Sequence, residues 1–424
     1  MSEERHIVAK NVAWNTFGSI FYLACQWLLS VAVVRFSSEA DSYVNAGVLS
    51  LAMSITGVFF IVALFNVKNF QVTASESEFS DGDFVLHRFL SCTLAFVLCA
   101  VFTLCMGYDG YTVLSVIAYM LLKAIEGVID VYHGAAQTVW RLDIAGKSFV
   151  MRGVALVVSF CAVLILGGPL PLAIVAMGAS SLILALVYDF PSISRLKGIK
   201  IRFDRDRIVS LTKICLPMVC YGICSNSLFP IAKLLLEVHH GEEMLGYYAS
   251  VSSIAMLVQA LVSFVFSPLI NLFDAAVKKN DKSTFYKLLF KLVALLVGIT
   301  LAALLASWLL GEPALTLVFG ESIRQHAHLL YPTIIISCLT AFVWLLGMLL
   351  VVLRRILLLC IGSVVGLLIS TVLSFILIPS SDYLGTNLAV IIGFAVMSVF
   401  YIISLFGCPL GEAADSNITE NTNG

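Results

Sequence analysis

The chain has 424 residues, of which 60% are hydrophobic and only 12% are charged, and its mean hydropathy is +1.01. A soluble globular protein carries about twice that share of charge, so the composition excludes this class and indicates a multi-pass membrane protein. We expect no nucleic-acid partner. The eleven cysteines lie almost entirely inside apolar segments and lack a metal-binding spacing, so we expect them to be packing residues. We also expect no removable signal peptide.

Twelve apolar segments have the length of a membrane-spanning helix. They are 11–34, 44–66, 88–107, 112–132, 153–167, 170–190, 214–236, 247–271, 288–310, 329–353, 356–378 and 385–406. The sequence therefore predicts an all-α polytopic membrane protein.

Basic residues are distributed unequally between the two sides of this arrangement. If the N-terminus is cytoplasmic, 21 of the 25 Lys and Arg residues fall in cytoplasmic segments, and only Arg35 and Arg324 lie outside. The remaining two, Lys123 and Lys233, lie within spans. By the positive-inside rule, we expect both termini in the cytoplasm.

The most basic connecting segment divides the chain into two halves of six spans. We predict an N-terminal lobe (1–190), a basic cytoplasmic linker (191–213), a C-terminal lobe (214–406) and a disordered cytoplasmic tail (407–424). The halves show a weak internal repeat. Each first span ends at a basic residue, and a glycine opens each second span, namely Arg35 with Gly47 and Lys233 with Gly246. Parallel repeats of this kind occur in transporters with a site between the halves.

Segment 112–140 carries three charges inside an apolar run. As a helix it places Lys123, Glu126 and Asp130 within roughly 60° of one another. A charge at the bilayer centre costs at least about 3 kcal/mol, so such residues usually face a bundle interior or a wet cavity. The same stripe includes Gly127, Gly134 and Gln137. The stripe is typical of a cavity wall, and the alternative is a structural ion pair between Lys123 and Glu126.

Three stretches of the chain carry a resemblance to a known family. They are Asn-Val-Lys-Asn-Phe-Gln-Val at 66–72, followed by Arg88; the block 123–153; and 233–249. Together they resemble the Wzx-type polysaccharide flippases of the multidrug/oligosaccharidyl-lipid/polysaccharide (MOP) exporter superfamily. Two positions depart from the family pattern. Lys233 stands where arginine is usual, which replaces a planar bidentate donor by a point charge, and Asn66 stands where glycine is common.

The resemblance implies a MATE/MOP-like pair of six-helix lobes that alternates between inward-open and outward-open states and moves a polyprenyl-diphosphate-linked oligosaccharide across a bacterial plasma membrane. Cationic or polar residues are then candidates for binding the cargo: Arg35, Lys123, Lys233, Gln26, Asn226 and Gln137. Carboxylates are candidates for ion coupling or structural charge: Glu126, Asp130 and Glu237. The cytoplasmic motif of the family corresponds to Arg141, Asp143, Lys147 and Arg152. We expect no cofactor and no metal, but a gradient of H⁺ or Na⁺ as the energy source.

Expected partners are the lipid-linked cargo, membrane lipid, and the polymerase and glycosyltransferases of the same polysaccharide pathway. Three alternatives remain open. Glu39 and Asp41 have the acidic spacing of a metal-dependent lipid-sugar transferase or polymerase, although this chain has no long outer segment for a catalytic domain. A cation-coupled multidrug antiporter of the same superfamily is the second. A flippase of lipid-linked peptidoglycan precursors is the third. No phosphate-binding glycine-rich lysine motif occurs, so we expect no nucleotide hydrolysis.

Overall fold

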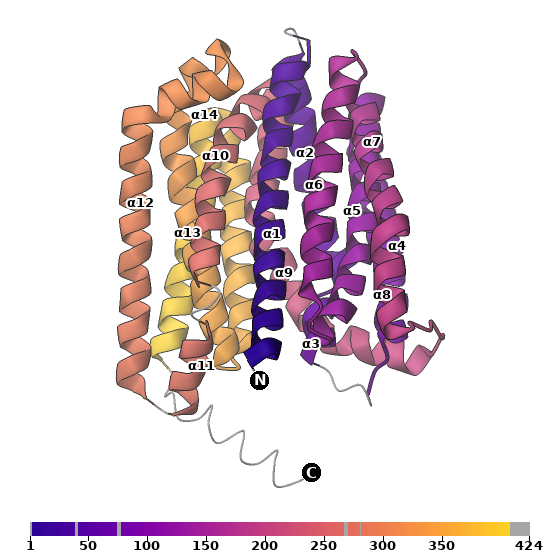
Figure 1. The fold of residues 1–424 in the computed structure, drawn as a ribbon. Helices are drawn as coiled ribbons and strands as arrows, with labels where there is room; N and C mark the ends of the chain where they lie inside the picture. Colours follow the sequence, from indigo (N-terminus) through magenta and orange to yellow (C-terminus); the bar gives the residue numbers. More distant parts are fainter. Residues whose placement is uncertain (1, 39–40, 74–77, 267–269, 280, 408–424) are drawn as a thin grey trace. The chain divides into compact units, whose positions relative to one another are not determined.

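The computed structural model describes residues 2–38, 41–73, 78–266, 270–279 and 281–407. In these ranges the chain forms helices joined by short connections and contains no strand (Figure 1). The predicted all-α fold is therefore confirmed. Residues 408–424 of the predicted tail and Glu39 lie outside the described residues.

The chain divides into two compact units. Unit 1 comprises Met1–Ile223 and Glu242–Gly246, and unit 2 comprises Cys224–Gly241 and Tyr247–Gly424. Two helices contribute to both units, namely α9 (Arg205–His240) and α10 (Glu242–Phe266). The predicted lobe boundaries at 190 and 214 stay a prediction.

Unit 1 contains nine further helical elements. They are α1 (Ser2–Phe36), α2 (Ser42–Leu64), α3 (Val67–Thr73), α4 (Asp81–Cys105), α5 (Gly110–Thr138), α6 (Leu142–Ile165), α7 (Leu170–Leu184), the π-helical η1 (Ala185–Asp189) and α8 (Phe190–Lys197). In unit 2 the other elements are α11 (Ile270–Lys278), α12 (Lys282–Phe319), the 3₁₀-helical η3 (Glu321–Leu329), α13 (Leu330–Val352) and α14 (Ile356–Phe406).

The helices account for the twelve predicted spans. Ten helical segments of the described chain are long and apolar enough to cross a membrane. One of them, α14, has 51 residues and contains non-helical backbone at Ser381 and Asp382, so it comprises two of the predicted spans. The apolar helix α10 accounts for the remaining one. The protein is thus a multi-pass membrane protein.

Helix α5 lies among the other helices of unit 1 and packs against α2, α4 and α7. It spans Gly110–Thr138, which extends beyond the predicted segment 112–132 at both ends, and Asp109 caps its first turn. The carboxylate of Asp109 accepts the backbone N–H of Thr112 at 3.1 Å. Hydrogen bonding to Thr112 is the main reason why the pKa of Asp109 lies below its ordinary value.

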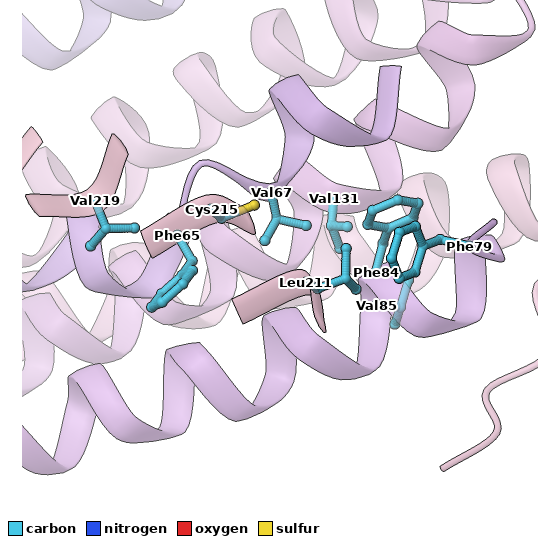
Figure 2. Packing of buried hydrophobic residues seen from close by; sticks show 9 residues of the cluster. All are labelled: Phe65, Val67, Phe79, Phe84, Val85, Val131, Leu211, Cys215 and Val219. Atoms are coloured by element: carbon cyan, nitrogen blue, oxygen red, sulfur yellow. The ribbon is translucent and has the colours of Figure 1, made fainter. Parts of the chain in front are cut away.

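A buried apolar cluster holds one end of α5 against its neighbours in unit 1. Figure 2 shows its nine side chains: Phe65, Val67, Phe79, Phe84, Val85, Val131, Leu211, Cys215 and Val219. Val67 precedes Lys68 on α3, and Val131 follows Asp130 on α5. The cluster therefore fixes the backbone next to two charged residues described below, Lys68 and Asp130.

Gly47 of α2 and Gly246 of α10, which the sequence places at equivalent positions in the two halves, allow the two helices to approach closely. A Cβ atom on Gly47 of α2 would lie 1.8 Å from the carbonyl oxygen of Glu242, and one on Gly246 would lie 1.8 Å from that of Tyr43. Both distances are far below van der Waals contact, so only glycine allows this backbone approach. The side chain of Glu242 also accepts a hydrogen bond of 2.8 Å from the Thr112 hydroxyl.

We expect Gly47→Leu to destabilise the protein, because any side chain here must push the start of α10 away from α2. Overpacking of this kind costs about 1–3 kcal/mol. Gly57→Leu on the same helix is the matched control, since a Cβ at Gly57 meets no atom within 4 Å. Thermal unfolding in a lipid–detergent micelle should separate the two variants. Equal melting temperatures would contradict the close contact.

Candidate functional site

The charged residues of α5 do not form one group, as the sequence predicts, but two. In the first, Nζ of Lys123 lies 2.8 Å from Oε2 of Glu126. The other oxygen of Glu126 accepts a hydrogen bond from the hydroxyl of Tyr22 on α1. The side chains of Lys123 and Glu126 are only 14% and 9% exposed. The ion pair that the sequence left as an alternative is therefore present, and it is joined by a tyrosine from another helix.

Aromatic rings surround the lysine of this group. Nζ of Lys123 lies 5.3 Å from the ring centroid of Phe60 on α2 and 5.5 Å from that of Tyr119 on α5. An ammonium group over an aromatic face is attracted by the ring quadrupole, and more strongly when water is excluded. The cation is thus held by one carboxylate and two rings.

Arg152 belongs to the same group, although the sequence places it in the cytoplasmic motif. Its guanidinium carbon lies 5.1 Å from the ring centroid of Tyr22 and 5.3 Å from that of Phe149. The residue is 3% exposed, and within the described chain its Nε and Nη1 have no hydrogen-bond partner. Buried N–H donors without an acceptor are rare in native proteins. Two N–H donors of Arg152 are therefore not used within the described chain.

Close packing of α1 on α6 brings Tyr22 to this place. A Cβ atom on Gly146 of α6 would lie 2.3 Å from the carbonyl oxygen of Trp14, and one on Gly18 of α1 would lie 2.2 Å from that of Gly146. Because the two backbones are this close, side chains one turn further along α1 can contact side chains of α6 and its neighbours. Tyr22 follows Gly18 by one turn and so reaches Glu126 and Arg152.

The second group is centred on Asp130. Its two carboxylate oxygens contact Nζ of Lys68 at 2.9 Å and Nη2 of Arg88 at 3.2 Å. The side chain of Arg88 is completely buried, and its Nη1 donates to the carbonyl oxygen of Ala63 at 3.2 Å. Asp130 and Lys68 are each about one quarter exposed. One carboxylate thus serves two cations from α3 and α4.

The turn between α2 and α3 orients the side chain of Lys68 toward α5. Phe65 and Asn66 both have left-handed backbone, with φ of 47° and 54°. Asparagine tolerates this conformation better than most residues, and glycine adopts it freely. This explains physically why Asn66 can stand where the resembling family commonly has glycine.

The two glycines on the charged stripe of α5 pack against side chains and do not line open space. A Cβ on Gly127 would lie 2.9 Å from Sγ of Cys92, and one on Gly134 would lie 2.2 Å from Oε1 of Gln71. At these two positions the predicted cavity wall is wrong. The glycines instead allow α3 and α4 to approach α5, which brings the cations to Asp130.

The predicted cytoplasmic motif is divided by the structure. Asp143, in the first turn of α6, accepts from Nε of Arg141 at 2.8 Å and from Nζ of Lys147 at 3.2 Å. These three residues form a local ion-pair group at the start of α6. Arg152 lies two turns further along the helix, beside Tyr22.

The other predicted site residues lie elsewhere. On α1, Gln26 is half-buried and Arg35 is exposed in the last turn, and Gln137 is half-buried near the end of α5. Three residues of α9 belong to unit 2: Asn226 is exposed, Glu237 is half-buried and Lys233 is buried. Nζ of Lys233 lies 4.6 Å from the ring centroid of Phe229. The roles assigned to these residues stay predictions.

Sequence reasoning missed five residues that the structure adds to these groups or places close to them: Tyr22, Lys68, Arg88, His133 and Asp189. Hydropathy assigned Lys68 and Arg88 to cytoplasmic segments, so their pairing with a residue of a span was not considered. One signal was available. Asp189 is an acidic residue at the end of an apolar segment, and such residues usually have a buried partner.

No cluster of three or more His, Cys, Asp or Glu side chains in the described chain is arranged to hold a metal ion. His240, at the end of α9, lies 2.8 Å from the carbonyl oxygen of Ile378 and 3.0 Å from the carboxylate of Asp382.

No family model matches the chain. It is similar to the capsular polysaccharide biosynthesis protein CapF of Staphylococcus aureus, with 21% identity over 404 residues that cover 93% of this chain and 98% of CapF. Its fold is similar to an inward-facing multidrug resistance MATE family transporter of the MOP superfamily, with a TM-score of 0.69, 13% identity and coverage of 96% and 99% of the two chains.

Two further structures share the fold. The lipid II flippase MurJ in an inward closed conformation has a TM-score of 0.68 and 12% identity over 96% of this chain and 90% of MurJ. A mutant of the Vibrio cholerae MATE transporter VcmN has a TM-score of 0.64 and 11% identity over 96% and 98% of the two chains. These similar structures are transporters and flippases, not enzymes. The chain thus shares the fold of these transporters and flippases, and its similarity to CapF extends over nearly the whole length of both chains. Both findings agree with the predicted resemblance to a polysaccharide flippase.

Proposed function

We propose that the protein is a secondary transporter that flips a polyprenyl-diphosphate-linked oligosaccharide from the inner to the outer leaflet of a bacterial plasma membrane for surface polysaccharide synthesis. The observation that carries the proposal is the charge of the two groups on α5. Four cations, Lys68, Arg88, Lys123 and Arg152, accompany two carboxylates, Glu126 and Asp130. The excess of two positive charges matches the two negative charges of a diphosphate diester.

The geometry supports a mechanism in which cations change partners. In the structure, Lys123 is held by Glu126, which avoids an isolated buried charge. An anionic head near Arg152 finds unused N–H donors, and guanidinium–phosphate hydrogen bonds are strong and directional. Lys123 then turns from Glu126 to the phosphate, while the Tyr22 hydroxyl remains on the carboxylate.

Similarity to CapF, which is named for capsular polysaccharide biosynthesis, and to MurJ, which is named for flipping lipid II, supports this choice of cargo. The MATE fold also supports the alternative, a cation-coupled antiporter for small molecules. A cationic drug requires an acceptor that is not already neutralised. Glu126 and Asp130 are both paired with cations of the protein itself, which favours the anionic cargo.

We expect purified protein in vesicles to move a lipid-diphosphate oligosaccharide between leaflets, as measured by its accessibility to a membrane-impermeant lectin. A monophosphate-linked saccharide with the same sugar and lipid is the matched control, and it should move more slowly because it brings less charge. Collapse of both the H⁺ and Na⁺ gradients should stop net movement against a cargo gradient. Export of an organic cation without lipid movement would favour the antiporter and reject the proposal.

We propose further that both termini face the cytoplasm and that glycosyltransferases and a polymerase act with the protein in one pathway. The orientation is supported by the distribution of Lys and Arg between the connecting segments. Reporter fusions within 191–213 should report the cytoplasm, and fusions at His239–Glu243 should report the outside. A cytoplasmic signal from His239–Glu243 would reject this topology.

A further inference from the structure

A buried histidine–aspartate pair lies within unit 1, close to the cations proposed to bind cargo but not part of their ion pairs. Nε2 of His133 on α5 lies 2.8 Å from Oδ1 of Asp189 at the end of η1. The two side chains are 1% and 0% exposed. In the part of the chain that the structure describes, Oδ2 of Asp189 has no hydrogen-bond partner. The pair therefore has an acceptor oxygen available in a place that excludes water.

The charge of this pair changes with one proton. A neutral imidazole that donates to an ionised carboxylate leaves a net charge of −1 with one oxygen unsatisfied, which is costly in a low-dielectric interior. One added proton gives either an imidazolium–carboxylate pair or a neutral carboxylic acid beside a neutral imidazole. Both forms have no net charge, so the pair can take up a single proton.

Charged groups from three helices lie around the pair. His133 is near Asp130 on its own helix, Lys68 of α3 and Arg152 of α6, and Tyr188 is next to Asp189 on η1. The cations stabilise the pair when its charge is −1. Asp130 is 27% exposed and lies one turn before His133 on the same helix.

The backbone under Asp189 is unusual for a membrane helix. Residues 185–189 form a π-helical segment, in which the N–H of Phe190 bonds to the carbonyl oxygen of Ala185. Pro191 follows and cannot donate to the helix, which explains the wider turn. Such π segments occur frequently at functional sites. A change of charge at Asp189 therefore acts where α7 joins α8.

A chain of contacts connects the pair to the first charged group. The ring of His133 packs edge-on against Phe149 at 5.4 Å between centroids, and the same phenylalanine lies under the guanidinium of Arg152. Arg152 in turn lies over Tyr22, which binds Glu126. The two sites are thus separated by only a few side chains.

We propose that His133 and Asp189 form a proton-binding site that takes up one proton in each transport cycle and that is distinct from the cations that hold the cargo. The cycle rests on the proposed function, whereas the binding of the proton does not. Because the proton adds positive charge close to Arg152, proton uptake and binding of an anionic head favour each other, and this linkage is reciprocal.

The site can be tested by counting protons directly. Purified protein in lipid nanodiscs is titrated between about pH 8 and pH 5, the range in which histidine changes charge, and proton uptake is recorded. Wild-type protein should take up one proton per chain more than Asp189→Asn or His133→Gln. The asparagine cannot ionise but still accepts the histidine hydrogen bond. His133→Gln removes the imidazole of the pair and with it the group that changes charge in this pH range.

His87→Gln is the matched control. His87 is also a buried histidine of unit 1, but its Nε2 lies 3.1 Å from the hydroxyl of Thr212 and not from an acid. His87→Gln should leave proton uptake by the His133–Asp189 pair unchanged. Adding Asp189→Asn to His87→Gln should therefore remove one proton, as it does in the wild-type protein. If Asp189→Asn takes up as many protons as wild type, the proton site is rejected.

The second readout is lipid-saccharide movement in vesicles at a series of pH values. Wild-type movement should vary with pH, and Asp189→Asn, which resembles the protonated pair, should lose this dependence. An unchanged pH profile in Asp189→Asn would reject the role in the cycle. If no variant moves the lipid at all, the proposed function fails, while the proton count still decides whether the site exists.

Discussion

Lys123→Gln should abolish polysaccharide export and leave the amount of folded protein in the membrane close to that of wild type. Glu126 retains the hydroxyl of Tyr22 and the nearby positive charge of Arg152, so its carboxylate is not isolated when the lysine is removed. The cargo, in contrast, loses a cation that no other residue of α5 replaces. Surface polysaccharide restored in a flippase-deficient cell, normalised to membrane protein, measures the effect.

Two variants make the test of Lys123 specific. Lys123→Arg should retain part of the activity, because the charge survives while reach and shape change. Lys213→Gln removes an exposed lysine of unit 1 and should export normally. Normal export by Lys123→Gln at equal protein level would remove this residue from the site. Joint loss of protein and activity, restored by a further Glu126→Gln, would identify the ion pair as purely structural.

Arg88→Leu should cause the largest loss of stability among the charged residues of unit 1. Breaking a buried ion pair by removing one partner costs about 3–5 kcal/mol, because the other charge is left behind. Lys68 still contacts Asp130, which is partly exposed, so we expect a value at the lower end of this range. The free energy of unfolding in lipid–detergent micelles is the measurement.

Arg324→Leu is the control for Arg88. Arg324 also forms ion pairs, with Glu312 and Glu321, but all three side chains are more than half exposed. Exposed pairs contribute about 0–1 kcal/mol, so the change should be small. Combining Arg88→Leu with Asp130→Asn should recover much of the lost stability. Equal stability of the two single variants, or no recovery in the double variant, would contradict the buried pairing.

The fold followed from the sequence because its main signal is local. Apolar length identified the spans, and the spacing of Lys123, Glu126 and Asp130 along one helix face was sufficient to select α5 as the helix that carries charge inside. The sequence also predicted the division of α14 into the spans 356–378 and 385–406. There the backbone breaks only at Ser381 and Asp382, and the flanking helices continue on both sides.

The partners of these charges could not be derived in the same way, because they depend on tertiary packing. Asp130 pairs with residues 62 and 42 positions earlier in the chain, and the Tyr22 hydroxyl reaches Glu126 across 104 positions. Hydropathy assigns a lysine next to a span to a loop, and it has no information on which helix that lysine faces. The close backbone approach of α1 to α6 decides the Tyr22 contact, and only the structure shows it.

The complete burial of Arg88 also has a consequence for biogenesis. During synthesis, α4 leaves the ribosome before α5, and 42 residues separate Arg88 from Asp130. At a synthesis rate of roughly 5–20 residues per second, Asp130 is synthesised about 2–8 s after Arg88. A lone arginine costs about 2.5–3.5 kcal/mol at the centre of a helix on insertion scales, and less near the start of a helix, where Arg88 lies in α4. We therefore expect the nascent α4 to stay beside the translocon until α5 has been synthesised. The two helices then enter the bilayer as a hairpin in which Arg88 is already paired with Asp130.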